Sequence, residues 1–360
     1  MIESLIGASY TIGGFDKAFM CIQTLLPLES WTAVPVANSI LHDAAPANTS
    51  TLNLELLESL VGRTFHKKTL LLEALTHGSY QGANAQMQSS YERLEFLGDA
   101  VLDYIVSKRL YAHEPPLSHQ KMHGIRTAMV NASFLAFRMF ETTVSEEATN
   151  KTTMQTEIQH RALWNFLRFG EPALNASRHA ALRQHQGARE QINVALLGDA
   201  RFPWHLLALT DAPKFLSDIV ESVIGAVYID SHGDIAACEV FVHRLGILDC
   251  LERIFRDKVD CFHPKELLNV LVVEKKVKYV RVGNDEGGGN RTDKTYRCQV
   301  MVDGENVGGV VEGPKRLQAE TIAAWKVGAI LEKRDDTIME DASEDEFFDS
   351  EEGGGVMLED

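Results

Sequence analysis

Apolar residues recur at helical spacing along most of the stretch from Leu54 to Phe140. They fall into several runs, and Pro115-Pro116 interrupts the pattern before the last run. The clearest early positions are Leu56, Leu57, Leu60, Val61 and the run from Leu70 to Leu75. Apolar positions three and four residues apart form one face of a helix. The pattern therefore predicts a mainly helical architecture for this part of the chain.

One of these predicted helices carries a stripe of acidic side chains. At about 100° per residue, four acids fall within roughly 80° of one another: Glu92, Glu95, Asp99 and Asp103. The rest of the helix is apolar, with Leu94, Leu97, Ala100, Val101, Ile105 and Val106. A solvated acidic face is one interpretation. The other is a partly buried face, where clustered carboxylates are costly unless a cation lies among them.

A second acidic segment favours the cation. Asp218 and Glu221 open another apolar run, Ser222–Ile229, and lie about one helical turn apart. Two such helices, far apart in sequence, predict one carboxylate-lined site built from both. Mg²⁺ is the expected ion, because it prefers a few carboxylates together with water and phosphate oxygens.

The pattern changes after Phe262. A helix is expected over Pro264–Lys276, and alternating residues from Thr295 to Val302 predict a half-buried strand. Asp303-Gly304 predicts a hairpin turn, a further strand follows to Val311, and Pro314 is suited to open a last helix. The expected order is α-β-β-β-α at residues 262–334.

Charge separates the C-terminal end from the rest. Residues 335–360 contain twelve acids and no Lys or Arg, which leaves only −4 of the total charge of −16 for the remaining chain. We expect a disordered acidic tail there. Residues 27–50 have the composition of a linker, and the polar stretch 145–212 has no assigned chemistry.

Three ordered motifs resemble the ribonuclease III family. They are Leu72–Tyr80, the signature Glu92-Arg93-Leu94-Glu95-Phe96-Leu97-Gly98-Asp99, and Pro213–Ser222, the last in the form seen in Dicer-like proteins. The resemblance implies a mainly α protein. It would have an all-α ribonuclease III endonuclease domain at 54–250, with 145–212 as its insertion.

The family resemblance implies roles for the acidic residues. Glu95, Asp99, Asp218 and Glu221 would bind two Mg²⁺ ions, with Mn²⁺ as a possible replacement, and Asp99, Glu221 and Lys214 would be catalytic. Glu92 would support them from the edge. The substrate would be double-stranded RNA, and the products would carry 5′-phosphate and 3′-hydroxyl ends. For Lys214, two hypotheses stay open: it steadies the phosphate, or it is a buried counter-ion for the acids.

The segment 262–334 resembles a double-stranded-RNA-binding domain, a small α+β module. Lys315 and Arg316 at the start of its last helix suit phosphate contacts. However, Leu317 and Gln318 stand where that family usually has further lysines, and the loop around Gly287-Gly288-Gly289 lacks its usual motif. RNA contact and a docking role both remain open for this segment.

The first ten residues repeat part of the third motif. Met1–Tyr10 aligns with Ile219–Tyr228, with six identities that include Glu3 with Glu221 and Gly7 with Gly225. We therefore expect residues 1–45 to be the remnant of a first ribonuclease III domain. Since these domains work in pairs, cleavage of both strands would need a homodimer or the missing N-terminal part. Phe96, Leu97 and Tyr104 are candidates either for that interface or for the core.

Three functions are consistent with these observations. The leading one is a Dicer-like endoribonuclease that feeds RNA silencing, the second is a non-catalytic double-stranded-RNA-binding scaffold, and the third is a general RNA-processing ribonuclease III. Five cysteines without a C-x-x-C pair and the lack of a signal-peptide pattern predict an intracellular protein, cytoplasmic or nuclear. No run is long enough to predict a membrane span.

Overall fold

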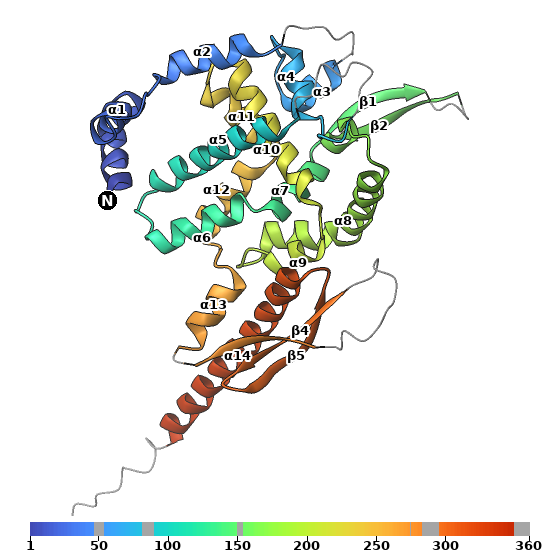
Figure 1. The fold of residues 1–360 in the computed structure, drawn as a ribbon. Coiled ribbons are helices and arrows are strands. Elements are labelled where there is room, and N and C mark those ends of the chain that lie inside the picture. The colour runs from blue at the N-terminus through green and yellow to red at the C-terminus, as the bar shows by residue number, and fades with distance from the viewer. Residues whose placement is uncertain (47–53, 81–89, 150–153, 274, 283–294, 349–360) are drawn as a thin grey trace, which may run out of the picture. The chain divides into compact units, whose positions relative to one another are not determined.

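The structure is a computed structural model that describes residues 1–46, 54–80, 90–149, 154–273, 275–282 and 295–348, with side chains up to residue 333. The chain packs as two compact units, and each is described by itself. Unit 1 comprises Met1–Arg109, Arg138–Asn175 and Lys214–Leu248. Unit 2 comprises Leu110–Phe137, Ala176–Pro213 and Asp249–Asp360. Figure 1 shows a mainly helical protein, which confirms the predicted fold class.

Unit 1 is built around α10, Lys214–Asp230, in which all but two of the residues are buried. The surrounding helices of this unit are α1 Ile2–Leu25, α2 Val34–Ala44, α3 Glu55–Val61, α4 Lys68–Ala74, α5 Glu92–Tyr111 and α11 Ile235–Arg244. The predicted acidic helix is α5, and its buried side chains include Leu94, Val101, Leu102, Ile105 and Val106. α10 contacts α2, α4 and α11. This packing places the second acidic segment deep in the unit.

α5 and α10 approach each other closely where both have a glycine. A Cβ atom at Gly98 of α5 would overlap the main-chain oxygen of Glu221, and one at Gly225 of α10 would overlap that of Leu94. Glycine inside a helix costs about 1 kcal/mol relative to alanine, so it needs a packing reason. Here the reason is main-chain contact between the two helices, which are drawn close together in Figure 1.

The expected linker contains a helix. α2 lies within residues 27–50, with Pro35 in its first turn, and Asn38 donates a hydrogen bond to the main-chain oxygen of His232. The Lys67 ammonium contacts the main-chain oxygens at the end of α2, among them that of Ala45 at 3.0 Å. A cation at a helix C-terminus is favourable because it meets the unpaired carbonyls. The linker composition was therefore misleading for this segment.

The stretch 145–212 is also largely ordered. It includes most of the antiparallel ribbon of β1, Thr143–Thr149, and β2, Thr156–Ala162, followed by the short 3-10 helix Leu163–Phe166 and α8, Pro172–Gly198. The mainly helical nuclease domain thus also contains a short two-stranded ribbon, and exposed and half-buried residues alternate along β1. α8 was not predicted because its polar sequence shows little periodicity and because glycine, here Gly187, usually disfavours a helix. In the structure Gly187 lies on an exposed face of α8, where an added Cβ would meet nothing within 4 Å.

Unit 2 contains the small α+β domain. Its elements are α13 Pro264–Leu271, β3 Val277–Arg281, β4 Tyr296–Val302, β5 Glu305–Gly313 and α14 Arg316–Phe348. The sheet order is β3-β4-β5, antiparallel throughout, which confirms the predicted α-β-β-β-α order. Asp303 and Gly304 both have positive φ, as the predicted hairpin turn requires. The buried face comprises Leu268, Val272, Cys298, Val300, Val302, Ala319, Ala323, Ala324 and Val327.

Helix α14 continues beyond residue 334, where the folded domain was expected to end. It reaches Phe348, because neither glycine nor proline occurs from residue 329 to residue 352. The other helices of unit 2 include α6 His119–Met129 and α9 Trp204–Leu209, whereas α7 Ala132–Glu141 and α12 Ile247–Asp257 have residues in both units. Among the described residues, no helix has the length and apolar character that crossing a bilayer requires.

The helix crossing can be tested by alanine substitution. We expect Gly98→Ala or Gly225→Ala to lower the free energy of unfolding by about 1–3 kcal/mol, because the added methyl group would push two main chains apart. Gly187→Ala is the matched control, since an added Cβ meets nothing within 4 Å there. It should stabilise the protein by roughly 0.5–1 kcal/mol. Equal effects at all three sites, measured by urea denaturation, would contradict the proposed role of the crossing.

Candidate active site

Three carboxylates from the two helices meet beside the glycine crossing. Glu95 of α5 and Asp218 and Glu221 of α10 each offer an oxygen, and these atoms lie within 4.8 Å of one another. Asp218 and Glu221 are buried, and Glu95 is half-buried. The two acidic segments therefore converge in the structure, as their sequence pattern predicted.

The other acids of α5 lie around this group. Asp99 is not part of the three-carboxylate set, although its charge strongly influences Glu221. Glu92 is exposed at the start of the helix, and Asp103 is half-buried one turn beyond Asp99. The helical stripe is thus preserved, but only its Glu95 oxygen lies in the group.

Lys214 lies directly against two of the carboxylates. Its Nζ is 2.7 Å from Asp218 Oδ1 and 3.0 Å from Glu95 Oε1. These hydrogen bonds, first of all the one with Asp218, raise the pKa of the ammonium group well above its usual range. The Lys214 side chain is nevertheless 73% exposed, so it can leave this position without a large packing cost.

Tyr91 closes the site from the other side of Asp218. Its hydroxyl lies 3.4 Å from Asp218 Oδ2, and its main-chain N–H donates to Thr76 O at 3.0 Å. Burial, followed by the charge of Asp218, raises the pKa of Tyr91, so the phenol keeps its proton and can donate it. The sequence pattern gave no reason to single out Tyr91, Gly98 or Gly225. The only available signal was glycine inside two apolar helices.

Burial and mutual repulsion raise the pKa values of the carboxyl groups. Burial, followed by the charges of Asp99, Asp218 and Glu95, raises the pKa of Glu221 to about 8. Burial also raises the pKa of Asp218 despite its bond to Lys214. At Asp99 the pKa rises because of burial and then the charge of Asp103. The site is therefore short of positive charge.

The donor set fits a hard divalent cation. Mg²⁺ binds oxygen at about 2.1 Å, so oxygens on opposite sides of one ion are about 4.2 Å apart. Three carboxylates within 4.8 Å match this requirement after small side-chain movements. Glu95, Asp218 and Glu221 are the residues that would hold the ion. Asp99 is the neighbouring acid that could contribute to a second ion.

The candidate RNA-binding residues Lys315 and Arg316 lie in unit 2 and both are paired with acids. Lys315 Nζ is 2.8 Å from Asp211 Oδ1, and Arg316 Nε is 2.7 Å from Glu320 Oε1. Lys265 Nζ also contacts Glu320, at 2.6 Å. Although burial opposes it, the bonds from Arg316 and Lys265 hold the pKa of Glu320 below its usual range. The predicted loop at Gly287-Gly288-Gly289 lies outside the described residues.

Two families match this chain. Residues 92–232 match the family described as "Ribonuclease III domain", and residues 257–359 match "Dicer-like protein 2, dsRNA binding domain". The first match contains Glu95, Asp99, Lys214, Asp218 and Glu221. The second extends through most of the acidic C-terminal stretch.

Similar proteins are longer than this chain. Dicer-like protein 2 of Phaeosphaeria nodorum is 64% identical over 362 residues, which covers 100% of this chain and 26% of that protein. Dicer-like protein 2-1 of Aspergillus niger is 39% identical, with 92% and 24% covered. The chain therefore spans about a quarter of the length of these relatives.

Two solved structures show weaker similarity. The nuclease domain of ribonuclease III from Campylobacter jejuni has a TM-score of 0.33 at 24% identity, covering 56% of this chain and 96% of that one. The Dicer structure from Pichia stipitis has a TM-score of 0.29 at 19% identity, covering 73% and 93%.

The raised pKa of Glu221 predicts a pH dependence. Its value of about 8, against 4.5 for an ordinary glutamate, means that the folded protein holds a proton that the unfolded chain releases. In the presence of a chelator, thermal stability should therefore fall as the pH rises from about 5 to about 8. Divalent cation binding, followed by calorimetry, should strengthen over the same range because the cation must displace this proton.

Glu221→Gln should remove most of this pH dependence. Glu190→Gln, at an exposed position of α8, is the control and should keep it. If the two variants had the same pH profile, the unusual protonation would not belong to Glu221.

Proposed function

The chain belongs to the ribonuclease III family, in its Dicer-like branch, and on that basis we propose that it is a Mg²⁺-dependent endonuclease that cleaves double-stranded RNA. The observation that carries this proposal is the three-carboxylate group of Glu95, Asp218 and Glu221. Mn²⁺ is the expected substitute for Mg²⁺, since both accept carboxylate and water ligands. A bound pair of ions would supply an activated water and stabilise the leaving 3′-oxygen.

The protein side chains have distinct parts in this proposal. Glu95, Asp218 and Glu221 hold the ions, and Asp99 stands beside Glu221, where it can bind or orient a water. Glu92, exposed at the helix start, supports the set through its charge alone. Because the two helices cross main chain to main chain, their carboxylates stay in register while RNA approaches.

Lys214 can serve both functions that its sequence position suggested. While the carboxylates lack a cation, its ammonium group neutralises Asp218 and Glu95. When a cation takes that place, the exposed side chain is free to turn toward the phosphate. An ammonium group on a flexible four-carbon chain suits such a movement.

Cleavage of long double-stranded RNA by the purified chain is the direct test. With Mg²⁺ we expect short products carrying 5′-phosphates, and a loss of at least about 100-fold in rate for Asp218→Asn and Glu95→Gln. Asp99→Asn should have a comparable effect if it is catalytic and a smaller one if it acts only through charge. RNA binding without cleavage by the wild-type chain would instead favour the scaffold function.

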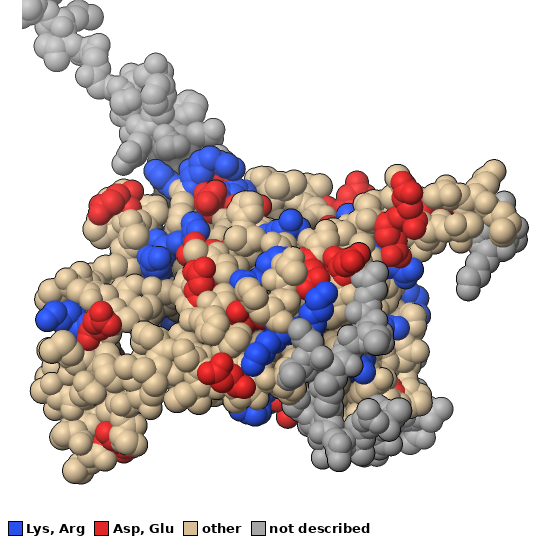
Figure 2. Space-filling view, turned by 90° about the horizontal axis from the view of Figure 1, so that it is seen from above, with Lys and Arg blue, Asp and Glu red and all other residues tan. Residues whose placement is uncertain are grey.

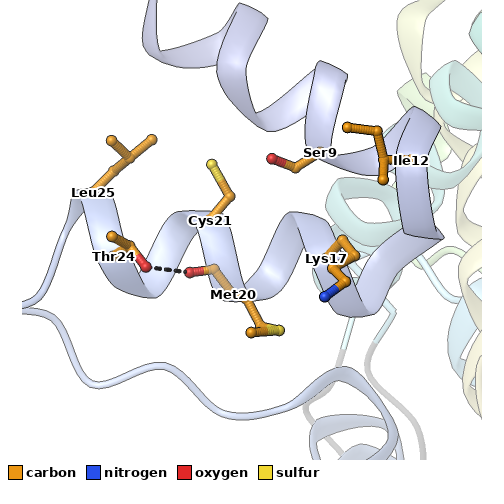
Figure 3. A pocket seen from close by; sticks show the side chains of 7 residues that line it. All are labelled: Ser9, Ile12, Lys17, Met20, Cys21, Thr24 and Leu25. Atoms are coloured by element: carbon orange, nitrogen blue, oxygen red, sulfur yellow. Dashed lines mark hydrogen bonds between the residues drawn. The ribbon is translucent and has the colours of Figure 1, made fainter.

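A second ribonuclease III domain is the expected partner, and α1 is the surface that supports this part of the proposal. α1 bends at Gly13 and Gly14, and a hollow of about 320 Å³ lies between its two halves (Figure 3). The surface of α1 is largely uncharged, as Figure 2 shows. Apolar side chains exposed on it include Ile2, Leu5, Ile12, Phe15 and Met20. Such a surface is typical of one that packs against another domain.

The candidate interface residues on α5 differ in their environments. Phe96 is 81% exposed, so core packing does not explain it. Leu97 is half-buried, and the Tyr104 hydroxyl lies 2.5 Å from that of Tyr10 on α1. Phe96 therefore supports an interface role, formed with a second copy or with an additional domain. With two sites acting on opposite strands, the duplex products would be suited to RNA silencing.

For the small domain, the contacts favour docking over RNA binding. Besides the Lys315–Asp211 pair, His205 of α9 stacks on Trp325 of α14, with ring centroids 4.0 Å apart and planes at 14°. Arg201 contacts both carboxylate oxygens of Glu332. These contacts join α14 to the segment around α9, and they pair the basic groups of Lys315 and Arg201 with acids.

A charge swap distinguishes docking from RNA contact. Lys315→Glu should lower the free energy of unfolding by up to about 1 kcal/mol, as for an exposed ion pair, and adding Asp211→Lys should restore it. Under docking, the affinity of both variants for double-stranded RNA should stay close to that of the wild-type chain. If Lys315→Glu weakens RNA binding and the swap fails to restore it, Lys315 contacts RNA directly.

A further inference from the structure

One segment of the insertion pairs through its main chain with the first family motif. In unit 1, the main-chain N–H of Arg168 donates to Leu75 O at 2.8 Å, and its carbonyl accepts from the N–H of His77 at 2.9 Å. The N–H of Gly170 lies 3.3 Å from Ser79 Oγ. Residues 168–170 therefore run alongside residues 75–79, which belong to the first family motif.

Hydrogen bonds connect this motif to the carboxylates. Thr76 accepts the hydrogen bond from the Tyr91 N–H, and the Tyr91 carbonyl accepts one from the Glu95 N–H at 2.8 Å. The Tyr91 hydroxyl in turn lies next to Asp218. Arg168 is thus connected to the catalytic acids through a short series of main-chain hydrogen bonds, and its position is fixed relative to them.

The side chain of Arg168 is held in an unusual way. Its guanidinium lies over the ring of Tyr80, 4.3 Å from the centroid, and no carboxylate of the described residues pairs with it. Both side chains are at least partly open to solvent, and Tyr80 is 36% exposed. Stacking uses only the flat face of a guanidinium, so the five N–H donors at its edge remain available.

RNA needs such a cation at this place. Five acids surround the site, Glu92, Glu95, Asp99, Asp218 and Glu221, against the single ammonium group of Lys214. Even two divalent cations only balance these charges, whereas the RNA backbone on either side of the cleaved bond remains negative. A stacked arginine with a free edge matches a phosphate group, which it can bind through two parallel hydrogen bonds.

We propose that Arg168, stacked on Tyr80, is a contact for an RNA backbone phosphate next to the cleaved bond, and that the insertion supplies it. This inference depends on the proposed function, because the phosphate belongs to the substrate. It assigns a binding role to a segment for which the sequence pattern suggested no chemistry. The contact would add affinity for RNA and fix the position of the RNA strand along the site. It would leave the carboxylates themselves unchanged.

The test measures RNA binding by the full chain over a series of salt concentrations. Glu221→Gln serves as the parent so that no RNA is cleaved. Arg168→Gln should weaken binding at low salt about five- to tenfold and reduce the slope of log affinity against log salt by about 1. Arg168→Lys, which keeps the charge but not the paired hydrogen bonds, should keep the slope and lose part of the affinity.

Arg161→Gln is the matched control, because it removes the same charge from the same insertion at a residue paired with Glu146. It should leave both the affinity and the slope unchanged. Thermal unfolding and Mn²⁺ binding, measured on the Arg168 variants in an otherwise wild-type chain, should also match wild type. A lowered melting temperature with an unchanged slope would show that Arg168 is only a structural brace, and would overturn the inference.

Failure of the inference can be distinguished from failure of the proposed function. If the parent protein does not bind double-stranded RNA, the function itself is wrong. If the parent binds RNA and Arg168→Gln binds it with the same affinity and slope, only the role of Arg168 is refuted.

Discussion

The structure of unit 1 depends on the close crossing of α5 and α10. Gly98 and Gly225 let the helices touch through their main chains, and each glycine has an acid of the site near it on the same helix. Glu221 precedes Gly225 by one turn, and Glu95 precedes Gly98 by three residues, so both acids lie on the contacting faces. Any larger residue at the crossing would separate the carboxylates. The same contact therefore determines the packing of the unit and the geometry of its site.

This arrangement keeps like charges together inside a folded protein. Burial and repulsion raise the pKa values of Glu221, Asp218 and Asp99, which means that the carboxylates by themselves oppose full ionisation. Lys214 relieves part of this repulsion from an exposed position. The strain is local, because the apolar residues of α10 are buried on all sides. A divalent cation would relieve this repulsion, although it must displace the proton on Glu221 and the Lys214 ammonium group to do so.

The sequence predicted those features that depend on local spacing. The acidic stripe, the second acidic segment and the α-β-β-β-α order all follow from periodicity and turn residues, and the structure contains them. It could not predict that Asp99 lies outside the tightest carboxylate group, because helical angle alone does not say which turn faces the crossing. Nor could it predict the partner of Lys315, since Asp211 lies far earlier in the chain and no pattern links the two. α2, α8 and the β1–β2 ribbon were missed because their compositions resemble those of loops.

The internal repeat includes the glutamate and the glycine that α10 uses at the crossing. Met1–Tyr10 keeps both the glutamate and the glycine of α10, as Glu3 and Gly7, at the same spacing of four residues. In α10 this pair is buried against α5, whereas Glu3 is exposed and a Cβ atom at Gly7 would meet nothing within 4 Å. An exposed glycine in a helix brings no packing benefit, and it costs about 1 kcal/mol relative to alanine. The same glutamate–glycine pair is therefore packed against a second helix in α10 and open to solvent in α1.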